Sequence, residues 1–243
     1  MSKILISGYY GFANAGDEAM LTAIIESLRQ VEKNVELTVL SGNPEDTAAK
    51  HQVCSVYRFN PLGIIRAMKD SELIISGGGS LLQDVTSKRS LLYYLSIIGL
   101  GKFFGKKVML FAQGIGPIRA KWARKLTSLV CNEADLITVR DSESAAELIE
   151  MGVKPEKITV TADSVLSLNP VTKECGQYLL QEAGVDLTKP VIGISVRPWS
   201  SDSQCFQVLA EAASKLQQSY GAQLILLPLQ YSVDVKALSL IHI

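Results

Sequence analysis

Two adjacent carboxylates follow a glycine-rich stretch near the start of the chain. Asp17 and Glu18 come after glycines at 8, 11 and 16, and the apolar residues beyond them have helical spacing. Carboxylates accept strong hydrogen bonds from sugar hydroxyls, and one placed against an attacking hydroxyl can remove its proton. A structural role fits equally well, because Asp17 could cap the helix and Glu18 could complement the helix dipole.

Two arginines directly follow later apolar runs that are predicted to be strands. Arg140 and Arg197 each follow such a run, and a guanidinium matches a carboxylate or a phosphate with two parallel hydrogen bonds. Gln113 and Asp163 occupy similar positions and have weaker cases. Surface or interdomain ion pairing is the competing explanation for either arginine.

The glycines do not match the nucleotide-binding motifs. Neither G-x-G-x-x-G nor G-x-x-x-x-G-K-[ST] occurs in the chain, and no acidic residue ends the second predicted strand. A helix N-terminus attracts anions, but two carboxylates at that end would repel a phosphate. The first turn, with Asn14 and Gly16, therefore favours a hydroxyl-bearing ligand, and we expect no cofactor.

Metal and histidine-dependent chemistry have little support. Four scattered cysteines form no CxxC pair, so we expect buried thiols in a reducing cytosol. Of the two histidines, His51 is expected on the surface between elements, and His242 lies in an apolar tail. A Ser/His/Asp arrangement has no support.

Short apolar runs alternate with helical patterns, and each run delivers glycine or polar residues at its carboxyl end. This alternation is typical of doubly wound parallel sheets, so the predicted fold class is α/β. The glycines after the third run, Gly77, Gly78 and Gly79, are expected to form a second turn. The predicted strands are residues 4–6, 35–40, 73–76, 107–112, 136–139, 158–161, 191–196 and 223–227.

We predict two Rossmann-like domains, residues 1–169 and residues 170–243. The second has only two clear strands, fewer than a sheet usually contains. Because residues 237–243 break off within what resembles the start of a helix, we expect an incomplete second domain.

Composition limits the classes of protein. The 243 residues carry 24 basic and 24 acidic side chains, which gives no electrostatic support for nucleic-acid binding. A strand begins almost at once, leaving no room for a signal peptide, so we expect a cytoplasmic protein. The apolar run 91–100 is too short to span a bilayer; a buried helix is favoured over one lying on an anionic membrane surface, although the latter would suit a lipid-linked substrate.

Four motifs in order resemble the polysaccharide pyruvyl transferase family, and its CsaB-like branch most closely. They are G-Y-Y-G-F-A-N-A-G-D-E-A, S-G-G-G-S-L-L-Q-D, A-Q-G-I-G-P and V-R-D-S, and the likeness extends from Ile4 to about Tyr231. The resemblance implies a fold similar to the GT-B glycosyltransferases, with the active site between two domains.

The resemblance also implies a reaction. The family transfers the enolpyruvyl group of phosphoenolpyruvate to two hydroxyls of one sugar, and the branch implies a lipid-linked N-acetylmannosamine-containing acceptor for polymers that anchor S-layer proteins. Asp17 and Arg140 are the implied catalytic residues. The implied substrate-binding residues are Asn14, Gly16, Glu18, Gly77, Gly78, Gly79, Gln113 and Arg197.

The sequence departs from the family in one respect. The resemblance implies further second-domain sequence bearing basic residues and a histidine for phosphoenolpyruvate, and His242 does not lie in a matching motif. Two alternatives stay open: a GT-B glycosyltransferase that uses a nucleotide sugar, and a non-catalytic saccharide-binding fragment.

Overall fold

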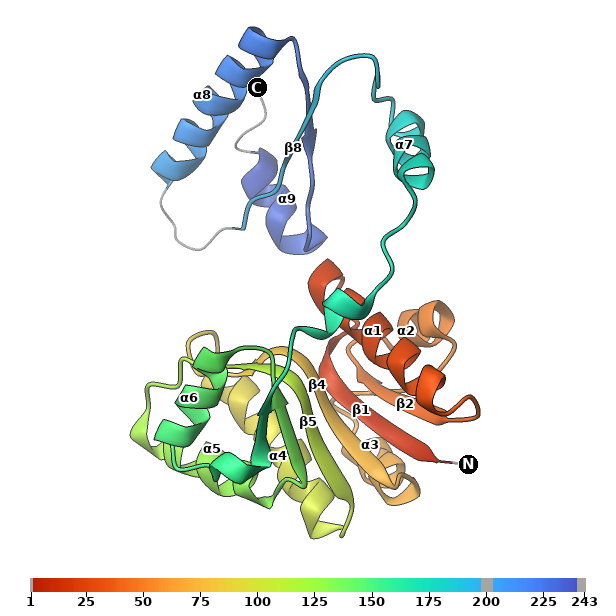
Figure 1. Cartoon of the computed structure of the whole chain (residues 1–243), viewed down its shortest axis with the longest axis vertical. Coiled ribbons are helices and arrows are strands. Elements are labelled where there is room, and N and C mark those ends of the chain that lie inside the picture. The colour runs from red at the N-terminus through yellow and green to blue at the C-terminus, as the bar shows by residue number, and fades with distance from the viewer. Residues whose placement is uncertain (1, 198–202, 240–243) are drawn as a thin grey trace. The chain divides into compact units, whose positions relative to one another are not determined.

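A computed structural model describes residues 2–197 and 203–239. The chain divides into two compact units: Met1–Phe12 with Gly16–Leu168, and Ala13–Ala15 with Asn169–Ile243. Figure 1 follows the chain through both by colour. Each unit is described separately below.

The first unit is built on a seven-stranded parallel sheet with the strand order β3-β2-β1-β4-β5-β6-β7. This confirms the predicted α/β fold. All pairings are parallel because each strand is separated from the next by a helix that returns the chain to the same end of the sheet. The strands are β1 (Lys3–Tyr10), β2 (Glu36–Ser41), β3 (Cys54–Tyr57), β4 (Leu73–Leu82), β5 (Lys107–Ile115), β6 (Leu136–Val139) and β7 (Ile158–Val160).

Helices cover both faces of this sheet (Figure 1). Apolar residues of α1 pack with the sheet in one buried cluster, whereas those of α3, α4, α5 and α6 pack in a second cluster that includes Leu5 and Leu110. The interior strand β1 contributes to both, since Leu5 belongs to the second cluster and Ile4 and Ile6 pack with α1. The helices are α1 (Ala15–Val31), α2 (Pro44–His51), α3 (Pro61–Asp70), α4 (Lys88–Phe103), α5 (Lys121–Glu133) and α6 (Ser142–Glu150).

The glycines at 77–79 do not form the turn that the sequence suggested. Strand β4 continues through them to Leu82, with Gly77 paired to Phe111 and Gly79 paired to Gln113 of β5. Positive φ angles of +30° at Gly78 and +79° at Gly79 let the strand keep pairing while it bends. Strand β1 likewise runs on through Gly8 to Tyr10.

One helix and one strand of the first unit were not predicted from the sequence. Helix α2 and the edge strand β3 lie between residues 44 and 57, a stretch interpreted as connecting polar sequence. The helix signal was present: Asn43 accepts a hydrogen bond from the Asp46 N–H, and Pro44 occupies the first turn.

Asp84 joins two loops that follow neighbouring strands. Its Oδ1 accepts a hydrogen bond from the Arg119 N–H and its Oδ2 accepts one from the Ala120 N–H, each at 2.9 Å. Both N–H groups lie just before α5, so one carboxylate satisfies two backbone donors that the start of that helix leaves open. The loop after β4 thereby holds the loop after β5.

The second unit contains two parallel strands and three helices among its described residues. Residues 13–15 join it because Asn14 forms an antiparallel bridge with Gln230 and the Ala15 N–H donates to the Leu229 carbonyl at 2.8 Å. The elements are α7 (Lys173–Glu182), β8 (Val191–Ile194), α8 (Ser203–Tyr220), β9 (Gln223–Leu226) and α9 (Tyr231–Ser239).

Two further expectations can be compared with the described residues. Of the four thiols only Cys131 is buried, so the expectation of buried cysteines is wrong for Cys54, Cys175 and Cys205. Within residues 2–197 and 203–239, none of the helices combines the length and the apolar character needed to span a bilayer. His242, part of the tail discussed above, lies outside the described residues.

Candidate active site

Glu18 closes the turn between β1 and α1. Its Oε1 accepts a hydrogen bond from the Gly11 N–H at 2.8 Å, and its Oε2 lies 3.4 Å from Nε2 of His51. The His51 side chain is only 9% exposed, so the expectation of a surface histidine is wrong. Because α2 delivers His51 to this point, Glu18 connects the first turn to a helix that the sequence did not reveal. Its predicted contact with a sugar hydroxyl stays a prediction.

Asp17 lies inside the first turn of α1, two residues after the helix begins at Ala15. It therefore does not occupy the N-cap position suggested by the sequence, although an acidic residue in the first turn still complements the helix dipole. Its Oδ1 lies 3.2 Å from where a Cβ on Gly79 would stand. The carboxylate thus lies against the end of β4, at the edge where parallel sheets bind ligands.

The glycine run of β4 packs closely against α1 and the end of β1. A Cβ at Gly77 would stand 2.6 Å from the Tyr10 hydroxyl, and one at Gly78 would stand 3.0 Å from the Met20 sulfur. The resemblance implied that these glycines bind substrate, which stays a prediction. Their side-chain positions are filled by α1 and Tyr10, so the glycines allow the helix that carries Asp17 to lie against the strand.

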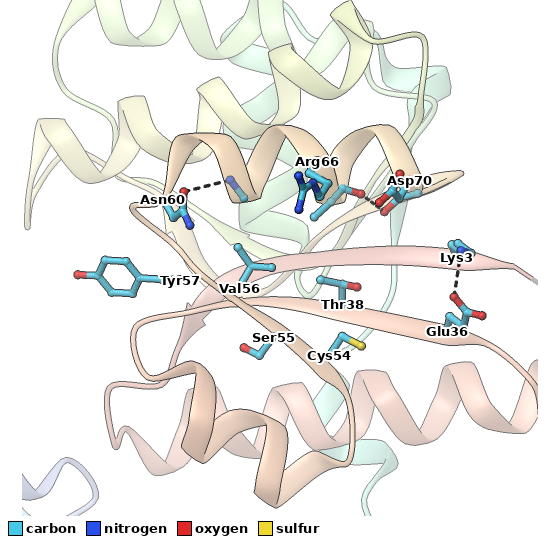
Figure 2. A pocket seen from close by; sticks show the side chains of 13 residues that line it. Lys3, Glu36, Thr38, Cys54, Ser55, Val56, Tyr57, Asn60, Arg66 and Asp70 are labelled. Atoms are coloured by element: carbon cyan, nitrogen blue, oxygen red, sulfur yellow. Dashed lines mark hydrogen bonds and ion pairs between the residues drawn. The ribbon is translucent and has the colours of Figure 1, made fainter.

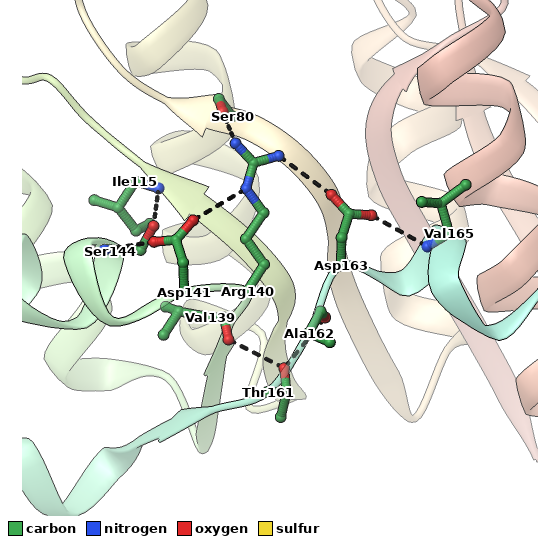
Figure 3. Close-up of polar contacts among 10 residues, drawn as sticks. All are labelled: Ser80, Ile115, Val139, Arg140, Asp141, Ser144, Thr161, Ala162, Asp163 and Val165. Carbon is green, nitrogen blue, oxygen red and sulfur yellow. Dashed lines mark hydrogen bonds and ion pairs between the residues drawn. The ribbon is translucent and has the colours of Figure 1, made fainter.

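Arg140, at the end of β6, is held by three side chains (Figure 3). Its Nη2 donates to Ser80 Oγ at 3.1 Å, its Nε to Asp141 Oδ2 at 3.3 Å and its Nη1 to Asp163 Oδ2 at 3.3 Å. The guanidinium lies over Gly114, where a Cβ would stand 2.7 Å from Arg140 Cζ. A glycine in β5 is thus what lets the guanidinium occupy this place.

Arg140 and the two carboxylates that pair with it carry a net negative charge. The hydrogen bonds from Ser144 and then the Arg140 guanidinium hold the pKa of the Asp141 carboxyl below its ordinary value. Two carboxylates therefore share one guanidinium, and an incoming anion would compete with both of them for its charge. Since Ser80 follows Gly79 directly, Arg140 and Asp17 both lie next to the end of β4.

Gln113 is fully buried and crosslinks two strands. Its Nε2 donates to the Ser76 hydroxyl at 2.8 Å and to the Ser76 carbonyl at 3.1 Å, which ties β5 to β4. The predicted contact with substrate would require this side chain to be uncovered. The contacts seen are structural.

Arg197 belongs to the second unit, just beyond β8. Its Nη1 lies 3.7 Å from Oδ1 of the buried Asp234, which also accepts a hydrogen bond from the Gln230 N–H through Oδ2. Residues 198–202, which follow it directly in the sequence, lie outside the described residues. The ion pair supports the competing interpretation of Arg197, and its role toward an anion stays a prediction.

Arg58 is a buried cation that the sequence analysis did not single out. Its guanidinium lies 4.3 Å from the centre of the Tyr93 ring and also contacts Phe12, Phe59 and Tyr94. It donates to the Gly8 carbonyl and the Tyr94 hydroxyl, and burial raises the pKa of Tyr94 to about 12. No ion pair of Arg58 with a carboxylate is found within the described residues. The faces of these four aromatic rings instead stabilise its charge by cation–π contact.

A groove of about 460 Å³ lies between α3 and the edge of the sheet (Figure 2). Lys3 and Glu36 form an ion pair at one end of it, and Tyr57 and Asn60 lie at the other. None of the predicted site residues lines this groove. It is therefore separate from the polar groups around the end of β4.

The sequence matches a family model described as polysaccharide pyruvyl transferase, over residues 14–243. The match includes Asn14 and the start of α1 with Asp17 and Glu18, β4 with its glycines, and Arg140. The chain belongs to the polysaccharide pyruvyl transferase family. This is a family of transferases, and the match confirms the resemblance seen in the four motifs without resolving the branch.

Solved structures with the same fold are glycosyltransferases and epimerases. HepE of Anabaena, in complex with UDP and glucose, is 14% identical with a TM-score of 0.59; the match covers 100% of this chain and 65% of that one. The UDP-GlcNAc 2-epimerase of Neisseria meningitidis, bound to UDP-GlcNAc, is 13% identical with a TM-score of 0.62; 99% of this chain and 69% of that one are covered.

The corresponding epimerase of Methanocaldococcus jannaschii is 11% identical with a TM-score of 0.61, again over 99% of this chain and 69% of its own. At these identities the likeness establishes the fold, which is of the GT-B type. The chain spans about two thirds of the length of these proteins. No curated protein matches the sequence.

Proposed function

We propose that the protein transfers the enolpyruvyl group of phosphoenolpyruvate to two hydroxyls of one sugar, forming a cyclic pyruvate ketal in cell-wall polysaccharide synthesis. Membership of the polysaccharide pyruvyl transferase family is the observation that carries this proposal. The proposed acceptor is a lipid-linked saccharide that contains N-acetylmannosamine, as the CsaB-like motifs suggest. The ketal would let secondary wall polymers hold S-layer proteins.

The chemistry balances as two additions to one carbon. A proton adds to the terminal CH₂ of phosphoenolpyruvate, the neighbouring carbon becomes electrophilic, and a sugar hydroxyl attacks it and loses its proton. The C–O bond to phosphate then breaks, inorganic phosphate leaves, and the second hydroxyl closes the ring with loss of its proton. The reaction needs a base near the sugar and cationic groups near the phosphate.

Asp17 is the residue we assign to the acceptor hydroxyl. It lies against Gly79 at the end of β4, in a carboxylate-bearing turn that would disfavour a phosphate. Asn14, Gly16 and Glu18 belong to the same turn and would shape the acceptor site. Arg140 would face the carboxylate or phosphate of the donor after exchanging one of its carboxylate partners.

Substitution of Asp17 by Asn tests this assignment. The change keeps the shape of the side chain and removes the proton acceptor, so we expect phosphate release from phosphoenolpyruvate, measured with the saccharide acceptor, to fall at least a hundredfold. Near-normal release by Asp17→Asn would return Asp17 to a helix-stabilising role.

Glu26→Gln is the matched control, because Glu26 is an exposed carboxylate of the same helix away from the sheet edge. It should leave phosphate release unchanged, and both variants should show the thermal unfolding midpoint of the parent. Absence of acceptor-dependent phosphate release in the parent would contradict the proposed reaction itself.

A nucleotide-sugar glycosyltransferase is the second candidate, since solved structures with this fold are complexes with UDP, UDP-glucose or UDP-GlcNAc. Thermal unfolding with each donor separates the two functions. A rise in the midpoint with UDP-glucose and none with phosphoenolpyruvate would favour the glycosyltransferase.

A further inference from the structure

Charge is distributed unevenly over the helices of the first unit. Helices α3, α4 and α5, which pack in the same apolar cluster, carry eight basic and two acidic side chains. Helices α1 and α2 carry five acidic and two basic ones. No aspartate or glutamate occurs between Asp84 and Glu133. These three helices are therefore basic in a protein without formal net charge, whereas α6 of the same cluster carries three glutamates and no basic side chain.

Some of these basic side chains form ion pairs with carboxylates. Lys102 pairs with Asp135 at 2.7 Å, and Arg124 pairs with Glu147 of the acidic helix α6 at 2.6 Å. In the part of the chain that the structure describes, Lys88 and Arg89, at the start of α4, take part in no ion pair. Both side chains are exposed.

The outward side of α4 is apolar where water-facing helices are usually charged. Leu91, Tyr94, Leu95 and Ile98 are buried against the sheet, as expected for a core helix. The exposed positions are Lys88, Arg89, Leu92, Ser96, Leu100 and Phe103, and after Arg89 they follow one another three or four residues apart, as on one face of a helix. Phe103 is 81% exposed.

Large apolar side chains are exposed on the helices to either side as well. Trp122 of α5, a helix that packs against α4, is 47% exposed and follows Lys121. Leu62 of α3 is 79% exposed. Aromatic and aliphatic side chains next to lysine and arginine form the pattern by which a helix lies in a membrane interface.

We propose that this surface, defined by Lys88, Arg89, Leu92, Leu100, Phe103 and Trp122 and called the α4 face, binds an anionic lipid bilayer. The apolar side chains enter the boundary between headgroups and acyl chains, while Lys88 and Arg89 contact lipid phosphates. The inference deepens the proposed function, because a lipid-linked acceptor would be held at such a bilayer.

The two other classes of partner fit the surface less well. A nucleic-acid surface would be dominated by lysine and arginine, whereas leucine and phenylalanine line the outer side of α4. A second copy would place Lys88 and Arg89 of each molecule in a common interface, and the α4 face itself contains no carboxylate to pair with them. Charge complementarity therefore favours anionic lipid.

Partitioning onto vesicles tests the proposal. We expect the protein to co-sediment with vesicles of phosphatidylcholine and phosphatidylglycerol in equal amounts, more weakly as salt is raised, and to leave vesicles of phosphatidylcholine alone largely unbound. A basic residue near an anionic surface contributes about 1 kcal/mol, so Lys88→Gln with Arg89→Gln should weaken partitioning roughly 30-fold. Phe103→Ser should weaken it roughly tenfold.

Matched controls lie on the opposite helix layer. Val31, at the end of α1, is 88% exposed, and Lys33 just after it is exposed too, so Val31→Ser and Lys33→Gln remove the same kinds of groups away from the α4 face. These variants should bind as the parent does. All variants should unfold at the parent's midpoint, because surface changes rarely alter stability by more than about 0.5 kcal/mol.

Three results would overturn the proposal: no binding to anionic vesicles, equal binding to neutral ones, or equal losses in the control variants. Loss of self-association in Phe103→Ser with unchanged vesicle partitioning would assign the α4 face to a second copy instead. Vesicle binding is measured without phosphoenolpyruvate or acceptor, so a negative result would not contradict the proposed pyruvyl transfer. Likewise, absence of phosphate release would not contradict the binding of the α4 face to vesicles.

Discussion

At the scale of residues, the two charged groups proposed for catalysis differ in how they are held. Asp17 is carried by the first turn of a helix that glycines allow to lie close to β4. Arg140 is carried by the end of a strand and is oriented by two carboxylates and a serine. The position of each charged group requires a glycine beside it, Gly79 next to Asp17 and Gly114 next to Arg140, because a Cβ there would stand too close.

Gly114→Ala tests the second dependence. A Cβ at this position would stand 2.7 Å from Arg140 Cζ, so the flexible guanidinium must move and give up part of its contacts with Ser80 and Asp163. We expect a loss of about 1 kcal/mol in the free energy of unfolding and a fall of tenfold or more in acceptor-dependent phosphate release.

A double-mutant cycle identifies the cause. In an Arg140→Ala background, Gly114→Ala should cost almost nothing further, because the group with which the methyl collides is gone. Gly99→Ala is the control: nothing lies within 4 Å of a Cβ there, and alanine in mid-helix should stabilise α4 by about 0.5–1 kcal/mol. Equal losses in both backgrounds would contradict the steric explanation.

At the scale of elements, the loops after β4 and β5 behave as one piece. Asp84 joins them through the backbone N–H groups of Arg119 and Ala120, and those hydrogen bonds hold the pKa of its carboxyl below the ordinary value. A carboxylate whose pKa is lower when folded stabilises the protein above its unfolded pKa, and this contribution is lost as the pH falls toward the folded pKa.

Asp84→Asn should therefore destabilise the protein in a pH-dependent way. At pH 7 we expect a loss of about 1 kcal/mol in the free energy of unfolding, a value reduced by the exposure of the site to solvent. As the pH is lowered below about 4, the parent loses the same contribution and the two proteins should converge. Urea unfolding at a series of pH values measures the difference.

Glu133→Gln serves as the comparison, since Glu133 is an exposed carboxylate at the end of α5. It should change stability by no more than about 0.5 kcal/mol at any of these pH values. A constant difference between Asp84→Asn and the parent down to pH 3 would show that the carboxylate charge is not what joins the loops.

At the scale of the molecule, alternation of apolar runs and helical patterns was enough to predict the parallel sheet. Side-chain period and strand length are local properties, and buried parallel strands such as β1 and β5 read as continuous apolar runs. The edge strand β3 escaped because Cys54–Tyr57 is short and only partly buried, so it carries no such run.

The site was less predictable than the fold. The sequence placed Asp17, the glycines of β4 and Arg140 near strand ends, and the structure brings Asp17 and Arg140 next to adjacent residues of one strand, Gly79 and Ser80. The partners were not predictable: Asp163 reaches Arg140 from 23 residues away, and His51 reaches Glu18 from 33. Arg58 was missed because nothing local shows that an arginine between two aromatic residues points inward.

The opposed charges of the helix layers have a consequence for how the protein behaves in chromatography. A uniform molecule with 24 basic and 24 acidic side chains would pass both kinds of ion exchanger at pH 7. Here the layer with Lys88 and Arg89 should adsorb to a sulfonate resin, and the layer of α1 and α2 to a quaternary ammonium resin. Lys88→Gln with Arg89→Gln should shorten retention on the first resin alone, whereas equal shifts on both would show that net charge governs adsorption.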